Sequence, residues 1–203
     1  MRSWDPPRLP PRLTASLHVP IVGRQAELAA LESVWDEVES GRGQLVFIGG
    51  EPGSGKTRLV AEVAGALAGV AAGVLVGTCS RDAGIPYEPF SEVLDELLAG
   101  APKDAFTELL GESSGELARL STRAARHLSA PADSPLPGGE GRRVLFDAVS
   151  GFFRALSETR PLALLLEDLH WSQLPTLALL EHVLLGCRQT RLLVLATFRT
   201  TTP

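Results

Sequence analysis

Short apolar runs alternate along this chain with longer segments whose apolar residues recur every three or four positions. The apolar runs have the length of buried strands and lie at 44–49, 73–78, 162–166 and 192–198. The periodic segments place their apolar side chains on one helical face and lie at 24–40, from 57 onward, and at 90–98, 143–158 and 174–185. Strands that alternate with helices predict an α/β fold with a parallel sheet covered on both faces.

The remaining segments complete the predicted organisation. Residues 103–110 and 115–128 each fit a further helix, and the Pro- and Gly-rich stretch 131–141 fits a surface loop. The first twenty residues contain five prolines among scattered arginines, which is typical of a disordered or extended lead-in. We therefore divide the chain into a lead-in at 1–20 and one α/β domain at 21–203.

Composition restricts the class of protein. A hydrophobic content of 44% and a charged content of 21% over 203 residues are ordinary for a globular domain. The net charge of −5, without a dense basic run, argues against nucleic-acid binding by this segment alone. Cys79 and Cys187 lie far apart in the sequence and have no metal-ligand spacing. With no apolar run of membrane-spanning length, we expect a cytoplasmic protein without a membrane partner.

A glycine-rich motif directly follows the first predicted strand. It fits the pattern Gly-x4-Gly-Lys-[Ser/Thr] and reads Gly50, Glu51, Pro52, Gly53, Ser54, Gly55, Lys56, Thr57. Arg58 continues it into the helix that follows. A strand, a glycine loop and a helix in this order direct backbone N–H groups and a positive helix end toward phosphate oxygens. The motif therefore predicts a site for a nucleoside triphosphate with Mg²⁺; the family resemblance described below makes this ATP or ADP.

The residue types in this motif match the chemistry. The glycines allow backbone angles that a side chain would forbid, and they let the chain approach phosphates closely. Lys56 is expected between the β- and γ-phosphates, and the Thr57 hydroxyl is expected on Mg²⁺. The competing interpretation, a glycine-rich turn that caps a helix, needs no ligand.

A second candidate motif ends the strand at 162–166. Glu167 and Asp168 follow this apolar run, and the carboxyl ends of parallel strands open onto one crevice. Such a pair can hold Mg²⁺ and orient an attacking water, with Glu167 as the metal-side acid and Asp168 as the catalytic one. The reverse assignment stays open, and an acidic pair after a strand is often only a polar turn.

With both motifs in place, the chain resembles the ATPase module of the STAND branch of AAA+-related P-loop proteins, as found in large LuxR-type transcriptional regulators. The segments that carry the resemblance are Ile21–Leu28, Gly50–Thr57, Leu164–Trp171 and Leu192–Arg199. The resemblance implies a P-loop NTPase three-layer sandwich with a parallel sheet. The glycine motif is common to many ATPases, whereas Val-Gly-Arg at 22–24 and Glu-Asp-Leu-His-Trp at 167–171 are more discriminating.

The resemblance also implies roles for individual residues. Val22 and Arg24 would lie near the adenine end of the nucleotide, and Thr197 and Arg199 would sense the γ-phosphate. For Arg199, a solvated arginine is an equal alternative. His170 and Trp171 either couple the acidic motif to neighbouring elements or form a packed turn. The chain departs from the family pattern at three positions, which are Gln25, Glu167 and Gln173.

The resemblance further implies a fifth strand, in the order 5-1-4-3-2, and a helical lid, neither of which is found before Pro203. We therefore expect the glycine-loop strand to lie at an unpaired sheet edge, which favours self-association. Any DNA contact would be made by a further domain.

The sequence is compatible with three functions. The favoured one is a nucleotide switch in a signalling or transcriptional regulator, which hydrolyses ATP weakly to ADP and phosphate. The alternatives are a nucleotide-binding relic with a structural role, and a motor or loader ATPase. The motor would need a basic surface that the sequence does not suggest.

Overall fold

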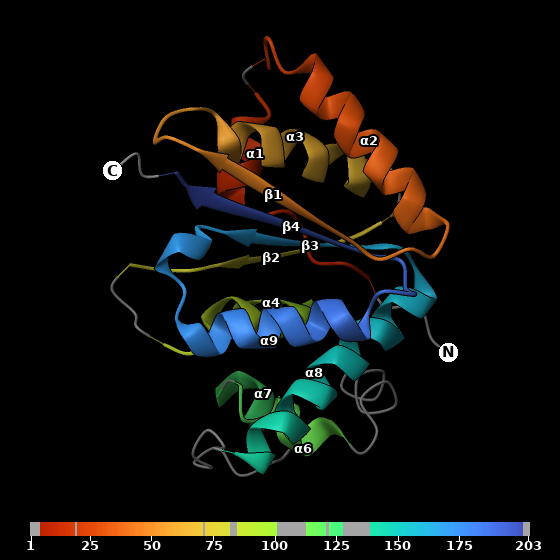
Figure 1. The fold of residues 1–203 in the computed structure, drawn as a ribbon, viewed down its shortest axis with the longest axis vertical. Coiled ribbons are helices and arrows are strands. Elements are labelled where there is room, and N and C mark those ends of the chain that lie inside the picture. Colours follow the sequence, from red (N-terminus) through yellow and green to blue (C-terminus); the bar gives the residue numbers. More distant parts are fainter. Residues whose placement is uncertain are drawn as a thin grey trace.

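The computed structural model describes residues 5–18, 20–70, 72–81, 85–100, 113–120, 122–127 and 139–200. Its centre is a parallel sheet of the strands β1 (Gln44–Gly50), β2 (Gly73–Thr78), β3 (Leu162–Glu167) and β4 (Leu192–Arg199). Their order in the sheet is β1-β4-β3-β2 (Figure 1). The predicted α/β class and the four predicted strands are confirmed. The observed order also agrees with positions 1-4-3-2 of the order that the resemblance implies.

Helices form a layer on each face of this sheet (Figure 1). One layer holds α1 (Pro11–Ser16), α2 (Gln25–Glu39) and α3 (Lys56–Gly69). The opposite layer holds α4 (Glu88–Gly100), α8 (Glu140–Thr159) and α9 (Leu174–Gly186). Two short helices, α6 (Ser114–Leu117) and α7 (Thr122–His127), pack beyond α8 and α4. None of the helices in the described ranges is long and apolar enough to cross a membrane.

The apolar core is divided by the sheet into two clusters. Along β3, Leu162, Leu164 and Leu166 face the cluster under α4, α8 and α9. Ala163 and Leu165 face the cluster under α2 and α3. Because both faces of the strand are covered, it is a continuous apolar run. Burying each of these leucines stabilises the fold by about 1.5–3 kcal/mol.

The lead-in is the clearest difference from the sequence-based expectation. Residues 11–16 form α1, which packs against α3, and Leu13 is completely buried. The physical reason is apolar packing, because Leu13 belongs to the cluster under α2 and α3, and Leu9 and Leu17, which flank α1, pack against it. Pro11 stands in the first turn of α1, where a missing N–H costs nothing. Residues 1–4 and 19 lie outside the described residues.

The segment between α4 and α8 also differs from the prediction. The helix expected over 115–128 is two helices, α6 and α7, separated by a turn at 118–120. The helix predicted at 103–110 lies outside the described residues, as does most of the loop predicted at 131–141. Glu140 already belongs to α8.

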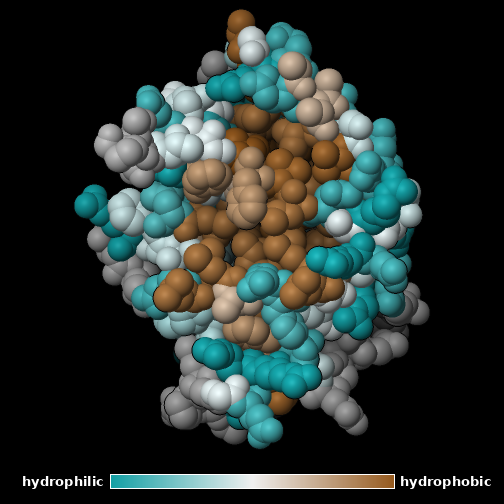
Figure 2. All heavy atoms as spheres, viewed as in Figure 1, coloured by the Kyte–Doolittle hydropathy of each residue, from teal (hydrophilic) through white to brown (hydrophobic). Residues whose placement is uncertain are grey.

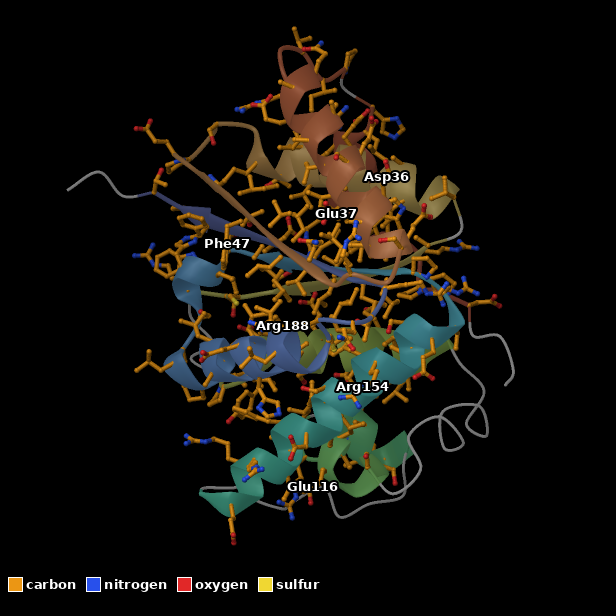
Figure 3. All side chains as sticks on the ribbon, turned by 45° about the vertical axis from the view of Figure 1, so that its right-hand side comes forward. Asp36, Glu37, Phe47, Glu116, Arg154 and Arg188 are labelled. Carbon is orange, nitrogen blue, oxygen red and sulfur yellow. The ribbon has the colours of Figure 1, made fainter. Side chains whose placement is uncertain are left out.

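The β1 edge of the sheet is apolar and uncovered in the described part of the chain. β1 pairs with β4 on one side, and no described strand pairs with its other side. Figure 2 shows a broad apolar area between the α2 and α3 layer and α9. A groove there is lined by residues that include Leu45, Phe47, Leu177, Leu184 and Arg188. Phe47 and Arg188 are labelled on this side of the molecule in Figure 3.

Candidate functional site

The carboxyl ends of the strands bring the two sequence motifs to one edge of the sheet. The glycine loop follows β1, and Glu167 and Asp168 stand at the end of β3. Between them lies β4, whose last residue, Arg199, is the register partner of Gly50. The parallel sheet therefore gathers segments more than a hundred residues apart in the chain.

The glycine loop has a backbone that requires glycine. Gly53 and Gly55 adopt φ values of 78° and 86°, a region that residues with a side chain rarely adopt. A Cβ atom at Gly50 would lie 2.6 Å from the Ser54 hydroxyl oxygen. At Gly53 and Gly55 the space that a Cβ atom would enter is open, and Glu51 and Pro52 are exposed. This geometry suits a ligand that approaches the backbone closely.

Lys56 opens α3 and folds back onto the loop. Its Nζ atom donates to the carbonyl oxygens of Gly50 at 2.7 Å and of Glu51 at 2.9 Å. The next residue, Thr57, is exposed at the first turn of α3. An ammonium group and a helix N-terminus therefore lie together at the end of β1, which favours an anion there. Arg58, also predicted in the site, instead forms an ion pair with Glu62 one turn along α3.

Arg24 connects the start of α2 to the loop. Its guanidinium donates to the Ser54 carbonyl oxygen at 2.8 Å and forms an ion pair with Glu27. The hydrogen bond from Arg24 lowers the pKa of the Glu27 carboxyl. The structure thus brings Arg24 to the predicted site. Val22, two residues earlier, is 83% exposed, so its side chain is open to solvent.

The two acids of the second motif have different environments. Glu167 is 6% exposed and lies at the end of β3. Asp168 has a φ of 58°, which is rare for a residue with a side chain, and its backbone N–H donates to the Thr197 hydroxyl at 3.0 Å. Its side chain is 41% exposed. The turn therefore separates a buried carboxylate from one that solvent and a ligand can reach.

His170 and Trp171 lie in the short 3₁₀ helix η2 (Leu169–Trp171), directly after the acids. Burial lowers the pKa of His170, and Arg199 and Lys56 act in the same direction, whereas Asp168 opposes them. Two guanidinium carbons lie over the Trp171 ring, that of Arg81 at 5.2 Å and that of Arg199 at 6.0 Å from the ring centroid. The end of β4 therefore places Arg199 at the crevice, within cation–π distance of Trp171.

Arg12 is a site residue that the motifs do not reveal. Its Nε atom donates to Glu167 Oε2 at 2.8 Å, and its Nη2 atom donates to Thr78 Oγ1 at 2.7 Å. The contact joins residues 155 positions apart. The only sequence signal is indirect: the four-residue spacing of Leu9, Leu13 and Leu17 is compatible with a helix, and Arg12 lies within it.

The described residues contain no group of three or more His, Cys, Asp or Glu side chains that could hold a metal ion by themselves. Mg²⁺ does not require such a group, because it keeps several waters and binds one or two carboxylates together with phosphates. The structure offers oxygen ligands of this kind in the Thr57 hydroxyl and the carboxylates of Glu167 and Asp168. The open glycine loop leaves space for the phosphates. The residues therefore fit a magnesium–phosphate ligand.

This architecture, a four-stranded parallel sheet with a glycine loop between its first strand and the following helix, is that of the P-loop NTPases. The family model of the AAA ATPase domain matches residues 20–195. The chain therefore belongs to the AAA ATPase domain family. A search of curated proteins finds no match to this chain.

Proposed function

We propose that this chain is an ATP-binding switch module of a signalling or transcriptional regulator of the STAND type, reset by slow hydrolysis of ATP. The observation that carries the proposal is the glycine loop, with Gly53 and Gly55 at positive φ and Lys56 bonded to its first carbonyl oxygens. This backbone favours a ligand of closely packed anionic oxygens. The acidic pair on β3, at the same sheet edge, supports a nucleoside triphosphate rather than a simple phosphate.

In this proposal each residue has a separate task. Lys56 and the backbone N–H groups at the start of α3 bind the phosphates, and Arg24 holds the loop through Ser54. Glu167 and the Thr57 hydroxyl would hold Mg²⁺, which supplies charge neutralisation on the phosphate oxygens. Asp168 would accept a proton from the attacking water, and its half-exposed carboxylate allows this contact.

Arg199 would give the site its dependence on nucleotide state. Arg199 ends β4, where it is the register partner of Gly50, the first glycine of the loop. Its guanidinium lies over the Trp171 ring. A cation in this position interacts more strongly with ATP than with ADP, because ATP carries the additional γ-phosphate charge. We infer that this difference drives the switch. Nucleic acid would be contacted only through a further domain, since the segment carries a net charge of −5.

The test is calorimetric binding of ATP and of ADP with Mg²⁺ to the chain and to Lys56→Ala, with Arg188→Ala as a control that removes an exposed cation elsewhere. The proposal expects both the chain and the control to bind ATP and ADP with different affinities, and Lys56→Ala to lose most of this affinity.

Asp168→Asn should retain ATP binding and lose hydrolysis. If the unaltered chain binds neither nucleotide, the relic is the better description. Fast turnover stimulated by a polymer would favour the motor.

A further inference from the structure

Arg12 connects the N-terminal helix to the acid that the proposed function assigns to the metal. The register partners Thr78 and Glu167 end β2 and β3, and the Arg12 guanidinium binds both side chains. The Glu167 side chain is 8% exposed, whereas that of Arg12 is 42% exposed. A largely buried carboxylate therefore has a counterion that solvent can still reach.

Helix α1 holds this counterion in place. Leu13, next to Arg12, is completely buried, and α1 packs against α3. Since α3 begins at Lys56, the helix that carries Arg12 rests on the helix that follows the glycine loop. The fold thus fixes the backbone at Arg12, while its side chain is 42% exposed and has room to change partner.

Other carboxylates lie beside Arg12. A groove on this side of the molecule is lined by residues that include Arg12, Glu88, Glu92 and Asp95. Glu92 accepts the backbone N–H of Thr78 at 2.6 Å. Burial raises the pKa of Glu92, and Arg12 acts against this rise, which is consistent with a short distance between the two charges. An arginine that left Glu167 would therefore still have acidic neighbours.

We propose that Arg12 and hydrated Mg²⁺ are alternative counterions of Glu167, so that Arg12 must leave this carboxylate before magnesium–nucleotide can bind fully. A guanidinium and a divalent ion on the same carboxylate would repel each other at close range in a poorly solvated site. Arg12 is then a positioning residue that acts through Glu167. It holds the acid in place when no metal is bound and raises the Mg²⁺ concentration that binding requires. This inference rests on the proposed function.

The test is a Mg²⁺ titration of ATP binding, measured by calorimetry at fixed ATP concentration, with no turnover readout. Arg12→Gln should lower the Mg²⁺ concentration for half-maximal binding by about two- to fivefold, the range expected when a partly exposed ion pair is lost. Arg12→Lys keeps the charge but not the two-point contact with Glu167 and Thr78, so its Mg²⁺ midpoint should lie between those of the unaltered chain and Arg12→Gln. Arg8→Gln is the matched control, because it removes the same charge from an exposed position in the same segment.

Thr78→Val tests the Arg12 contact without altering Arg12 itself. It removes one of the two contacts of Arg12 and keeps every charge, so it should shift the Mg²⁺ midpoint in the same direction as Arg12→Gln but by less. Thermal melting without nucleotide confirms that each variant is folded.

The possible outcomes separate the inference from the proposed function. Equal midpoints for Arg12→Gln and Arg8→Gln would overturn the inference and leave ATP binding intact. A higher midpoint in Arg12→Gln would also overturn it, since Arg12 would then assist nucleotide binding. ATP binding by none of the proteins would refute the proposed function, and the inference with it.

Discussion

Asp168 donates its backbone N–H to the hydroxyl of Thr197, and this hydrogen bond of 3.0 Å connects the turn after β3 to β4. Thr197 is 4% exposed, so the acceptor of this partly buried bond has little access to water. Asp168 has a φ of 58°, a conformation that costs about 1 kcal/mol or more for a residue with a side chain. The Thr197 hydroxyl therefore helps to keep the acidic turn in a conformation that it would otherwise leave.

Thr197→Val removes this acceptor without changing the side-chain volume greatly. We expect the free energy of unfolding to fall by about 1–2 kcal/mol, because the Asp168 N–H would lose its partner at the edge of the core. Urea denaturation measures the change. Thr197→Ser is the control, since it keeps the hydroxyl. Equal stability of the Val variant and the original chain would mean that the hydrogen bond contributes nothing net.

The backbone of the glycine loop gives a second prediction. Gly53→Ala places a side chain at a φ of 78°, so it should cost about 1 kcal/mol of stability and weaken ATP binding. Gly69→Ala is the matched control, because it ends α3 in open space, where alanine is the better helix former. Denaturation and calorimetry on both variants compare the effects. A Gly69→Ala loss as large as that of Gly53→Ala would contradict the backbone argument.

His170 gives a dependence of stability on pH. Burial lowers its pKa below the ordinary 6.5, so the unfolded chain binds more protons than the folded chain just below that pH. The stability that His170 contributes as a neutral ring is complete above 6.5 and is lost as the pH falls toward the lowered value. Denaturation between pH 7.5 and about 5 should therefore show a shallower decline in His170→Gln.

The difference between these two curves isolates His170 from other groups. Burial raises the pKa of Glu92, and this gives stability an opposite slope above its ordinary pKa of 4.5. Both chains contain Glu92, so its effect cancels in the difference. Parallel curves for the original chain and His170→Gln would show that the histidine is not the cause.

The sequence predicts best those parts of the fold that depend on local patterns. β2 has the predicted bounds, 73–78, because the run is apolar and both faces of the strand are covered. The glycine loop and the acidic pair are also local, and the parallel sheet then brings them together at one edge. The sequence does not indicate that 115–128 is divided into α6 and α7, since the apolar spacing continues across the turn.

The prolines account for the difference in the lead-in. Five prolines in twenty residues predict an extended segment, whereas Pro11 is compatible with the start of a helix and Leu13 is buried by it. The contact of Arg12 is not predictable from the sequence for another reason. Its partner, Glu167, is 155 residues away, and no local pattern specifies which arginine reaches a particular carboxylate.

The exposed β1 edge gives the last prediction. Phe47 is 55% exposed beside the apolar groove that also contains Leu177, and no described strand pairs with the outer side of β1. Exposed apolar strand edges are templates for association. Phe47→Lys should therefore reduce self-association of the chain in a dilution series followed by sedimentation velocity.

Val144→Lys is the matched control for this prediction, because Val144 is 52% exposed on α8, away from the groove lining. It introduces the same charge, so a general effect of net charge on solubility would appear in both variants. Only Phe47→Lys should shift the population toward the monomer, since only this lysine stands on the edge strand. Equal sedimentation of the two variants would locate the association elsewhere on the molecule.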